Sequence, residues 1–157
     1  MFATTSRPVR WSGFAALACI AFLSGGLTGA SAAETPASLA GVTLVTAEQA
    51  KKMVDSGVAI VDARVANEYA EAHVKGAISV PYKEKSAKAV DFNPKEDSFD
   101  LSKLPTDKNA SLIFYCNAGE CWKSYKASKA AVEAGWKKVY WMRGGFPEWK
   151  AKGYPVE

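Results

Sequence analysis

Two cysteines in one short stretch are the residues of this chain best suited to chemistry. Cys116 directly follows the apolar run at residues 112–115, and Cys121 comes five residues later. A thiolate is a strong nucleophile, and the N–H groups of a loop or of a helix N-terminus stabilise its negative charge. A free cysteine can also be a small, unreactive residue of the core. From the local pattern alone, both interpretations of Cys116 stay open.

The spacing of the two cysteines raises the question of a disulfide. The stretch between them contains Ala118 and Gly119, so it can bend until the two Cα atoms come within the range of about 4.4–6.8 Å that a disulfide requires. We therefore expect the thiols to lie close together. Cys121 could then resolve a persulfide or a sulfenate on Cys116 by forming a disulfide. An independent second thiol is the alternative.

Composition limits the classes of protein to which the chain can belong. Its 157 residues are 48% hydrophobic and 23% charged, as in one folded domain rather than a disordered or multi-span membrane protein. A net charge of +4 is too weak for us to expect a nucleic acid partner. Three cysteines and one histidine are too few for a disulfide-rich scaffold or a structural zinc site, and we expect no metal and no cofactor.

Residues 1–33 have the pattern of a secretory signal peptide. Two arginines precede an apolar stretch at residues 11–23, and small residues then predict cleavage after Ala32 or Ala33. An uncleaved anchor helix is the alternative, but the stretch is short for a membrane span, which needs about 20 apolar residues. We therefore expect a periplasmic or secreted protein that has no membrane partner once the signal is removed.

The rest of the chain must fold so as to position the cysteines, after a loose, polar lead-in at residues 34–41. We expect strands at 42–45, 58–61, 77–80, 112–115 and 139–142, and helices at 47–56, 67–72, 124–133 and 146–152. Thr46 and Gln49 have the spacing of a capping box for the first helix. The alternation predicts an α/β domain with a mainly parallel sheet. Residues 83–108 interrupt it, as a solvated surface excursion or as a lid over the site.

Four short motifs stand in a fixed order along residues 42–156. They are I-V-D-A-R-V-A-N-E-Y at 60–69, A-H-V-K-G-A-I-S-V-P at 72–81, Y-C-N-A-G-E at 115–120 and R-G-G-F-P-E-W at 143–149. In this order they resemble a single domain of the rhodanese (sulfurtransferase) family. The resemblance implies a rhodanese-like domain at residues 42–157. Such a domain has three layers, with a mainly parallel sheet and helices on both of its faces.

The resemblance also implies a reaction and a set of site residues. The family's cysteine takes sulfur from a small donor such as thiosulfate, keeps it as a persulfide, and passes it to cyanide or a thiol. By position, this cysteine is Cys116. The substrate-binding residues implied by position are Asn117, Ala118, Gly119, Glu120, Cys121, Trp122 and Lys123. Asp62, Arg64 and His73 match family positions to which we assign structural roles, with His73 packed or hydrogen-bonded.

The loop after Cys116 departs from the family's usual form. Ser124, the expected first residue of the next helix, stands eight residues after Cys116, which makes the loop longer than usual. A wider loop could accept a donor larger than thiosulfate. The Cys-Trp pair at 121–122 is similar to that of an exported rhodanese-like subgroup, some members of which accompany quinone-dependent oxidation of alcohols or amines. Trp122 either walls the pocket or belongs to the core.

Two functions stay open at this point. The first is an exported sulfurtransferase that uses Cys116. The second is a periplasmic thiol redox or sulfur-carrier protein that uses the Cys116/Cys121 pair with a redox partner. The cysteine after the strand argues against a binding module without catalysis. Glu120 opposes formation of a thiolate at Cys116, whereas Lys123 and Lys126 favour it, and the sequence leaves this balance open.

Overall fold

A five-stranded parallel sheet forms the centre of the computed structural model, which describes residues 33–157. The strands are β1 (Val42–Leu44), β2 (Ala59–Asp62), β3 (Ile78–Ser79), β4 (Ser111–Tyr115) and β5 (Lys138–Met142). Their order across the sheet is β1-β5-β4-β2-β3, and every neighbouring pair is parallel. The predicted parallel sheet is confirmed. The predicted signal peptide, apart from its last residue, lies outside the described residues.

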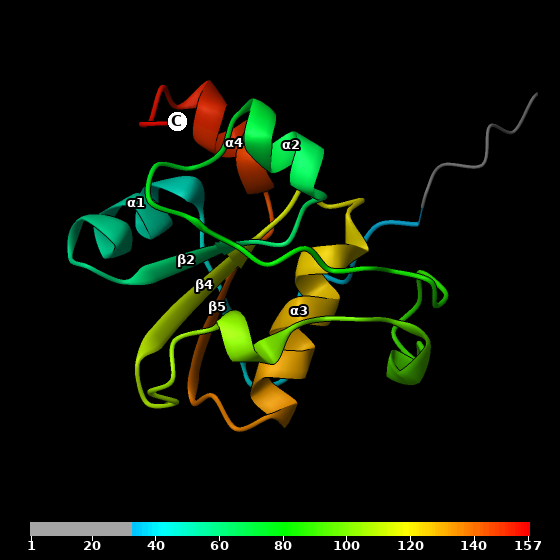
Figure 1. The fold of residues 1–157 in the computed structure, drawn as a ribbon. Coiled ribbons are helices and arrows are strands. Elements are labelled where there is room, and N and C mark those ends of the chain that lie inside the picture. The colour runs from blue at the N-terminus through cyan, green and yellow to red at the C-terminus, as the bar shows by residue number, and fades with distance from the viewer. Residues whose placement is uncertain (1–32) are drawn as a thin grey trace, which may run out of the picture. The chain divides into compact units, whose positions relative to one another are not determined.

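Helices cover both faces of this sheet (Figure 1). They are α1 (Ala47–Asp55), α2 (Ala66–Glu71), α3 (Trp122–Glu133) and α4 (Gly145–Ala151), with short 3-10 helices at Pro94–Glu96 and Leu101–Lys103. Helices α1 and α4 contribute to one apolar cluster, and α3 contributes to another. The predicted α/β fold with three layers is confirmed. None of the helices within residues 33–157 is long and apolar enough to cross a membrane.

Strand β4 shows why the sheet needs both layers of helices. Side chains alternate between the two faces of a strand. Leu112 and Phe114 pack in the cluster of α3, whereas Ile113 and Tyr115 pack in the cluster of α1 and α4. A strand that is covered on both faces is apolar along its whole length. The strand that leads into Cys116 is therefore held from both sides.

The predicted start of α1 is confirmed and the predicted start of α3 is wrong. Thr46 and Gln49 form the capping box in front of α1, each side chain accepting a hydrogen bond from the other's backbone N–H. Helix α3 begins at Trp122 rather than Ser124. Ser124 is buried, and its hydroxyl accepts a hydrogen bond of 2.9 Å from the Trp141 indole. It therefore faces the sheet from inside the helix and does not cap it.

The segment at residues 83–108 is irregular, as predicted, but it is tied to α3 by one buried lysine. The Lys126 ammonium lies 3.0 Å from a carboxylate oxygen of Glu84 and donates to the Ser86 hydroxyl at 2.9 Å. Asp97 lies 3.6 Å from the same ammonium and accepts hydrogen bonds from the N–H and the hydroxyl of Ser86. The segment is therefore an anchored excursion.

The charge of Asp97 is stabilised by its neighbours within this segment. Burial opposes the ionised carboxylate, but hydrogen bonds from Ser86, from the Lys85 N–H and from the Tyr82 hydroxyl outweigh that cost. Together they lower the pKa of Asp97 to about 2. Burial and the hydrogen bond to Asp97 raise the pKa of Tyr82. Asp97 therefore carries a full negative charge at neutral pH, opposite the buried ammonium.

Candidate active site

Cys116 lies at the carboxyl end of β4, the middle strand of the sheet. In α/β proteins, ligands bind beyond this edge, in the loops that follow the strands. The Cys116 side chain is 0% exposed. We call residues 116–121, which connect β4 to α3, the active loop.

A disulfide between Cys116 and Cys121 closes the active loop. The two Cα atoms are 6.2 Å apart, so the predicted proximity of the two cysteines is confirmed. Within the loop, the Cys121 N–H donates to the Ala118 carbonyl at 3.2 Å, and Ala118 has a positive φ of 59°. Cys121 is partly exposed and is the N-cap residue of α3, whereas Cys116 is enclosed. The two cysteines therefore differ in their exposure to solvent.

The backbone donors and acceptors of the active loop are used differently. The N–H groups of residues 117–120 donate no hydrogen bond to any other described residue. Two carbonyl groups are bound from outside: that of Cys116 accepts the Phe146 N–H at 2.8 Å, and that of Gly119 accepts the Thr35 N–H at 2.8 Å. Consecutive unpaired N–H groups beside the N-terminus of a helix such as α3 can bind an anion. The loop therefore offers donors for a negatively charged sulfur.

Glycine at position 145 lets α4 approach the active loop. Gly145 has a φ of +63°, and a Cβ atom on it would lie 2.3 Å from the Cys116 carbonyl oxygen. Glycine adopts this φ readily and has no Cβ to clash. The close approach brings the Phe146 N–H within hydrogen-bond distance of the Cys116 carbonyl.

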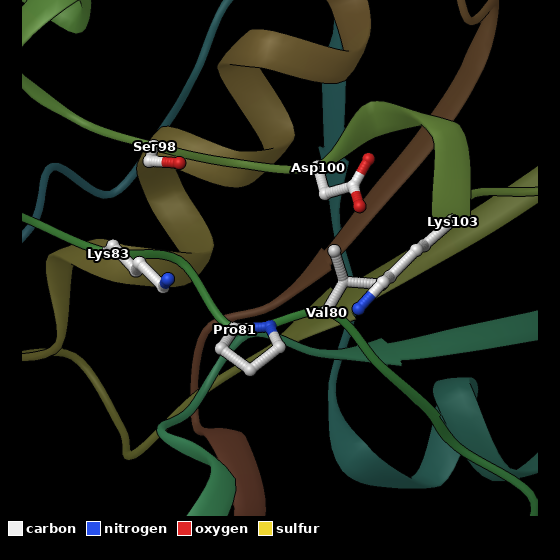
Figure 2. A pocket seen from close by; sticks show the side chains of 6 residues that line it. All are labelled: Val80, Pro81, Lys83, Ser98, Asp100 and Lys103. Carbon is white, nitrogen blue, oxygen red and sulfur yellow. The ribbon is translucent and has the colours of Figure 1, made fainter.

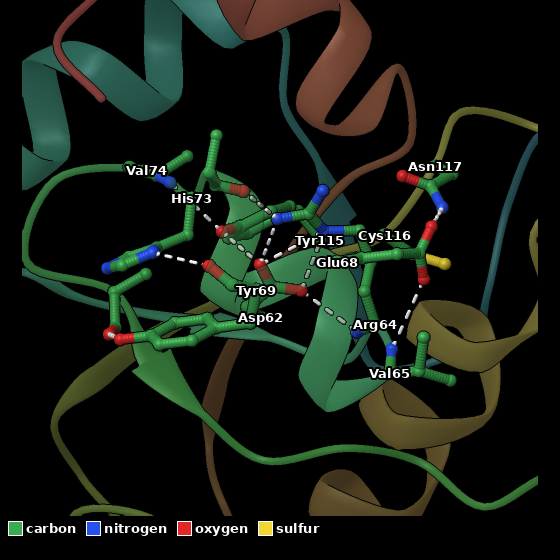
Figure 3. A network of polar contacts seen from close by, with 12 residues as sticks. Asp62, Arg64, Val65, Glu68, Tyr69, His73, Val74, Tyr115, Cys116 and Asn117 are labelled. Carbon is green, nitrogen blue, oxygen red and sulfur yellow. Dashed lines mark hydrogen bonds and ion pairs between the residues drawn. The ribbon is translucent and has the colours of Figure 1, made fainter. Parts of the chain in front are cut away.

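A buried ion pair between Arg64 and Asp62 lies beside β4 (Figure 3). Arg64 Nη2 is 2.6 Å from Asp62 Oδ2 and also donates to the Ala72 carbonyl at 2.7 Å. The Tyr115 hydroxyl donates to Asp62 at 2.5 Å and accepts the Val74 N–H at 3.1 Å. Burial acts to lower the pKa of Arg64, but the hydrogen bond to Asp62 and the attraction of the Asp62 charge together outweigh burial and raise that pKa. Burial raises the pKa of Tyr115. These matched contacts support the predicted structural role of Asp62 and Arg64.

His73 is packed and hydrogen-bonded, as its predicted structural role requires. Its ring stacks on that of Tyr69, with ring centroids 3.7 Å apart, and its Nδ1 lies 2.8 Å from the Tyr69 carbonyl oxygen. Its Nε2 lies 3.5 Å from the Glu157 carboxylate. None of these contacts involves the active loop.

Asn117 contacts an acidic residue for which we predicted no role. Its side-chain amide donates a short hydrogen bond to the Glu68 carboxylate, which also accepts the Val65 N–H at 3.3 Å (Figure 3). In the sequence, Glu68 is one acidic residue within the motif at 60–69, and nothing marks it as a neighbour of the loop. The side chain of Asn117 is therefore held toward α2, while its backbone N–H has no partner in the part of the chain that the structure describes.

Trp122 belongs to the core. It is 3% exposed, and its ring centroid lies 5.1 Å from that of Tyr125. Its indole N–H donates to the Ala33 carbonyl at 2.7 Å. Of the two interpretations of Trp122, these contacts support a core aromatic rather than the wall of a pocket.

The charges near the active loop differ from those expected. Glu120 is exposed and Lys123 is half-buried, and neither forms an ion pair with another described residue. Lys126, which we expected to favour the Cys116 thiolate, instead has its ammonium tied to the segment before β4. The cation beside the loop is Arg143: its guanidinium carbon lies 3.1 Å from the position that a Cβ on Gly119 would take.

Thr35 also reaches the active loop, which the sequence did not predict. Residues 34–41 were expected to form a loose lead-in, and for Thr35 this is wrong, because it is 2% exposed and hydrogen-bonded to Gly119. Thr35 is 84 positions from Gly119 and 108 positions from Arg143, which also bonds to it. No local pattern of residues can reveal contacts across such separations.

The cavity in Figure 2 lies apart from the active loop. Its volume is about 500 Å³, and its lining residues are Val80, Pro81, Lys83, Ser98, Asp100 and Lys103. All six belong to the stretch that follows β3, and none belongs to the active loop. We therefore place the candidate active site at Cys116 rather than in this cavity.

This chain is similar to known proteins in its sequence and in its fold. Residues 46–152 match the family model of the rhodanese-like domain. Rhodanese-like domain-containing protein 17 of Arabidopsis thaliana is 31% identical over 118 residues, which cover 74% of this chain and 73% of that protein. Thiosulfate sulfurtransferase 16, chloroplastic, of the same plant is 27% identical over 113 residues, covering 72% of this chain and 91% of that protein.

The chain is also similar to part of a larger enzyme and to a protein of known structure. The tRNA uridine(34) hydroxylase of Yersinia pestis is 31% identical over 119 residues, which cover 71% of this chain but only 30% of that enzyme. A crystal structure of a Bacillus halodurans protein has a TM-score of 0.56 and 23% identity, covering 73% of this chain and 76% of that one, and it shares the fold. With the family match spanning strands β2 to β5, the active loop and α4, this chain belongs to the rhodanese-like domain family.

Proposed function

We propose that this protein is an exported rhodanese-type sulfurtransferase that carries sulfur as a persulfide on Cys116. One observation carries the proposal. A cysteine at the carboxyl end of the middle strand is followed by four N–H groups that have no partner among the described residues. Such donors stabilise both a thiolate and the terminal sulfur of a persulfide. The similarity to a thiosulfate sulfurtransferase supports the same reaction.

The proposed reaction needs no group beyond the chain and its two substrates. The Cys116 thiolate attacks the outer sulfur of thiosulfate, the sulfur–sulfur bond of the donor breaks, and sulfite leaves with the electron pair. The product is a persulfide anion on Cys116, facing the N–H groups of the active loop. Cyanide or a thiolate then attacks the terminal sulfur, and Cys116 leaves as a thiolate again.

The disulfide supports a second candidate function, in thiol redox chemistry. While Cys116 is bonded to Cys121, it has no thiolate with which to attack a donor. Cys121 is the more exposed sulfur, so a thiolate from a reductant would attack it, forming a mixed disulfide and releasing the Cys116 thiolate. A second thiolate of the reductant would then attack the reductant's sulfur in the mixed disulfide. Cys121 would leave as a thiolate, and the reductant would leave as a disulfide. In this function the pair cycles between disulfide and dithiol, with little turnover of thiosulfate.

Export belongs to the same proposal. The signal-like pattern at residues 1–33 would direct the chain to an oxidising compartment, where a disulfide persists unless a dedicated reductant opens it. A mature protein that begins at Ala33 or Glu34 is the expected product. Intact mass of the exported protein measures this directly, and retention of Met1 with the apolar stretch would disprove it.

Sulfur transfer is tested on the reduced protein. Incubation with thiosulfate should add the mass of one sulfur atom to Cys116, and addition of cyanide should remove it and release thiocyanate. The matched variants are Cys116→Ser and Cys121→Ser, because each keeps one thiol of the pair. A reduced protein that takes up no sulfur but cycles between thiol and disulfide with a redox partner would favour the second function alone.

A further inference from the structure

We propose that Thr35 and Arg143 are positioning residues for the active loop: they hold the Gly119–Glu120 peptide with its carbonyl toward Thr35 and its N–H toward the opposite side, where the sulfur chemistry takes place. This inference rests on the proposed function of Cys116. It adds two residues, far from Cys116 in the sequence, whose contacts fix one of the donors that the reaction would use.

Thr35 binds the Gly119 carbonyl twice. Its backbone N–H donates at 2.8 Å and its hydroxyl donates at 2.6 Å to the same oxygen. Thr35 is 2% exposed, so water competes little for these bonds. A carbonyl oxygen has two lone pairs, and both of those on Gly119 are used here.

Arg143 sets the direction of the Thr35 hydroxyl. Its Nε donates to the hydroxyl oxygen at 3.1 Å, and its Nη2 donates to the Thr35 carbonyl at 2.7 Å. Because arginine is only a donor, the hydroxyl must accept from it, and its own hydrogen is then left to donate to Gly119. Glu34 lies 3.2 Å from Nη2 and adds a partly exposed ion pair. Arg143 and Thr35 therefore act as one unit.

The peptide that Thr35 binds, between Gly119 and Glu120, is the middle peptide of a turn. The hydrogen bond from the Cys121 N–H to the Ala118 carbonyl makes residues 118–121 a turn, with the Gly119–Glu120 peptide in its middle. Neither Gly119 nor Glu120 has a positive φ, so the turn is not of type II. In a type I turn, reversing the middle peptide by about 180° gives a type II turn. The reversal exchanges the positions of the carbonyl and the N–H and requires a positive φ at Glu120.

The two bonds from Thr35 oppose this reversal. A trans peptide is planar, with its carbonyl and N–H on opposite sides, so a carbonyl held toward Thr35 directs the Glu120 N–H away from it. In the reversed peptide, the Gly119 carbonyl would point into the loop instead. A carbonyl there would repel a thiolate or a persulfide, whereas an N–H stabilises either one.

The test uses the reduced protein with Cys121→Ser, so that Cys116 is the one cysteine left after the predicted signal. Thr35→Val removes the hydroxyl and keeps the shape of the side chain, and Thr35→Ser keeps the hydroxyl. Thr43→Val, on an exposed position of β1, is the matched control. Two quantities are measured: the pKa of the Cys116 thiol, from the pH dependence of alkylation by iodoacetamide, and the rate of persulfide formation with thiosulfate.

We expect Thr35→Val to raise the thiol pKa and to slow persulfide formation by about tenfold, the effect of losing one hydrogen bond. Thr35→Ser should restore both quantities, and Thr43→Val should change neither. An unchanged thiol pKa in Thr35→Val would overturn the proposal. Should that variant not fold, Arg143→Lys decides in its place, because it keeps the charge but loses the forked contact with Thr35. An unchanged thiol pKa in Arg143→Lys would also overturn the proposal.

The two readouts separate this proposal from the one on which it rests. If the parent protein forms no persulfide, the proposed function fails, while the alkylation pKa still reports whether Thr35 controls the thiol. If the parent forms a persulfide and Thr35→Val behaves like it in both measurements, the sulfur chemistry stands and the positioning role is wrong.

Discussion

The active loop and the excursion at residues 83–108 are both irregular, but they are stabilised in opposite ways. In the excursion, Asp97 accepts several hydrogen bonds and, together with Glu84, faces the buried Lys126 of α3, so its buried carboxylates are compensated by donors and a cation. In the active loop, the carbonyls of Cys116 and Gly119 are bound from outside, while the N–H groups of residues 117–120 have no partner within residues 33–157. Matched polar groups indicate a structural loop, and unmatched donors in a fixed loop indicate a binding site.

The two regions also differ in the kind of bond that closes them. The excursion is anchored by the buried ion pairs of Lys126. Breaking these pairs costs free energy whatever the redox potential. The active loop is closed by a disulfide of a very short loop, which restricts the unfolded chain only slightly. Substitutions in the excursion should therefore change stability, and substitutions of the cysteines should change chemistry.

The largest effect expected is the loss of sulfur transfer in Cys116→Ser. A serine hydroxyl forms no anion near neutral pH and does not accept sulfur, so no persulfide should form. The free energy of unfolding of the reduced protein should change little, because the replacement is nearly isosteric. Mass spectrometry after incubation with thiosulfate measures the first quantity and urea denaturation the second. Sulfur transfer retained in Cys116→Ser but lost in Cys121→Ser would assign the nucleophile to the other cysteine.

Oxidation should produce the next largest effect on activity, and that effect should be reversible. The protein with the disulfide should contain no free thiol and transfer no sulfur, and a mild dithiol reductant should restore both. Thiol counting before and after reduction, with an activity assay on the same samples, checks this. Two free thiols and full activity in protein purified under air would leave the disulfide without a role.

Lys126→Met should destabilise the fold by about 3–5 kcal/mol, because it leaves buried carboxylates without their cation. Oε2 of Glu84 has no hydrogen-bond partner among the described residues, so the ion pair with Lys126 is its only compensation. Urea denaturation gives the free energy of unfolding. Lys129→Met is the control, since Lys129 forms a more exposed pair with Glu133 on the same helix. Equal stability of the two variants would mean that the excursion needs no such anchor.

A smaller effect is expected from acid. The pKa of Asp97 is lowered from 3.8 to about 2 in the folded protein. Its contribution, about 2 kcal/mol, should therefore be fully present above about pH 4 and should be lost as the pH falls toward 2. Comparing the pH dependence of unfolding in the parent and in Asp97→Asn isolates this carboxylate. Parallel curves between pH 4 and 2 would show that Asp97 does not cause the acid sensitivity.

The parts of the molecule that sequence predicts well depend on near neighbours. The capping box of Thr46 and Gln49 spans three residues, and the apolar strand before Cys116 is a continuous run. The order of the motifs predicted the family. The predicted start of α3 was wrong because the helix already begins at Trp122, and Ser124 lies inside it, where its hydroxyl accepts the indole N–H of Trp141.

The parts that sequence could not predict depend on distant partners. Lys126 was expected to favour the Cys116 thiolate, yet it is 0% exposed and its ammonium faces acidic partners on a different segment of the chain. Thr35 looked like part of a flexible lead-in, yet it is buried between Gly119 and Arg143. In both cases tertiary packing creates the environment of the residue, and the pattern of apolar residues along the sequence does not predict such packing.

The contact between Thr35 and the active loop has a consequence for the order of folding. Contacts between residues far apart in sequence form late, because the chain between them must first be ordered. Thr35 leaves the ribosome before Gly119 and Arg143 exist, and it can bind them only after β4 and β5 have joined the sheet. The active loop therefore cannot take its final shape until the chain has been made through Arg143, because the residue that holds the Gly119 carbonyl lies near one end of the described chain and is itself held by Arg143.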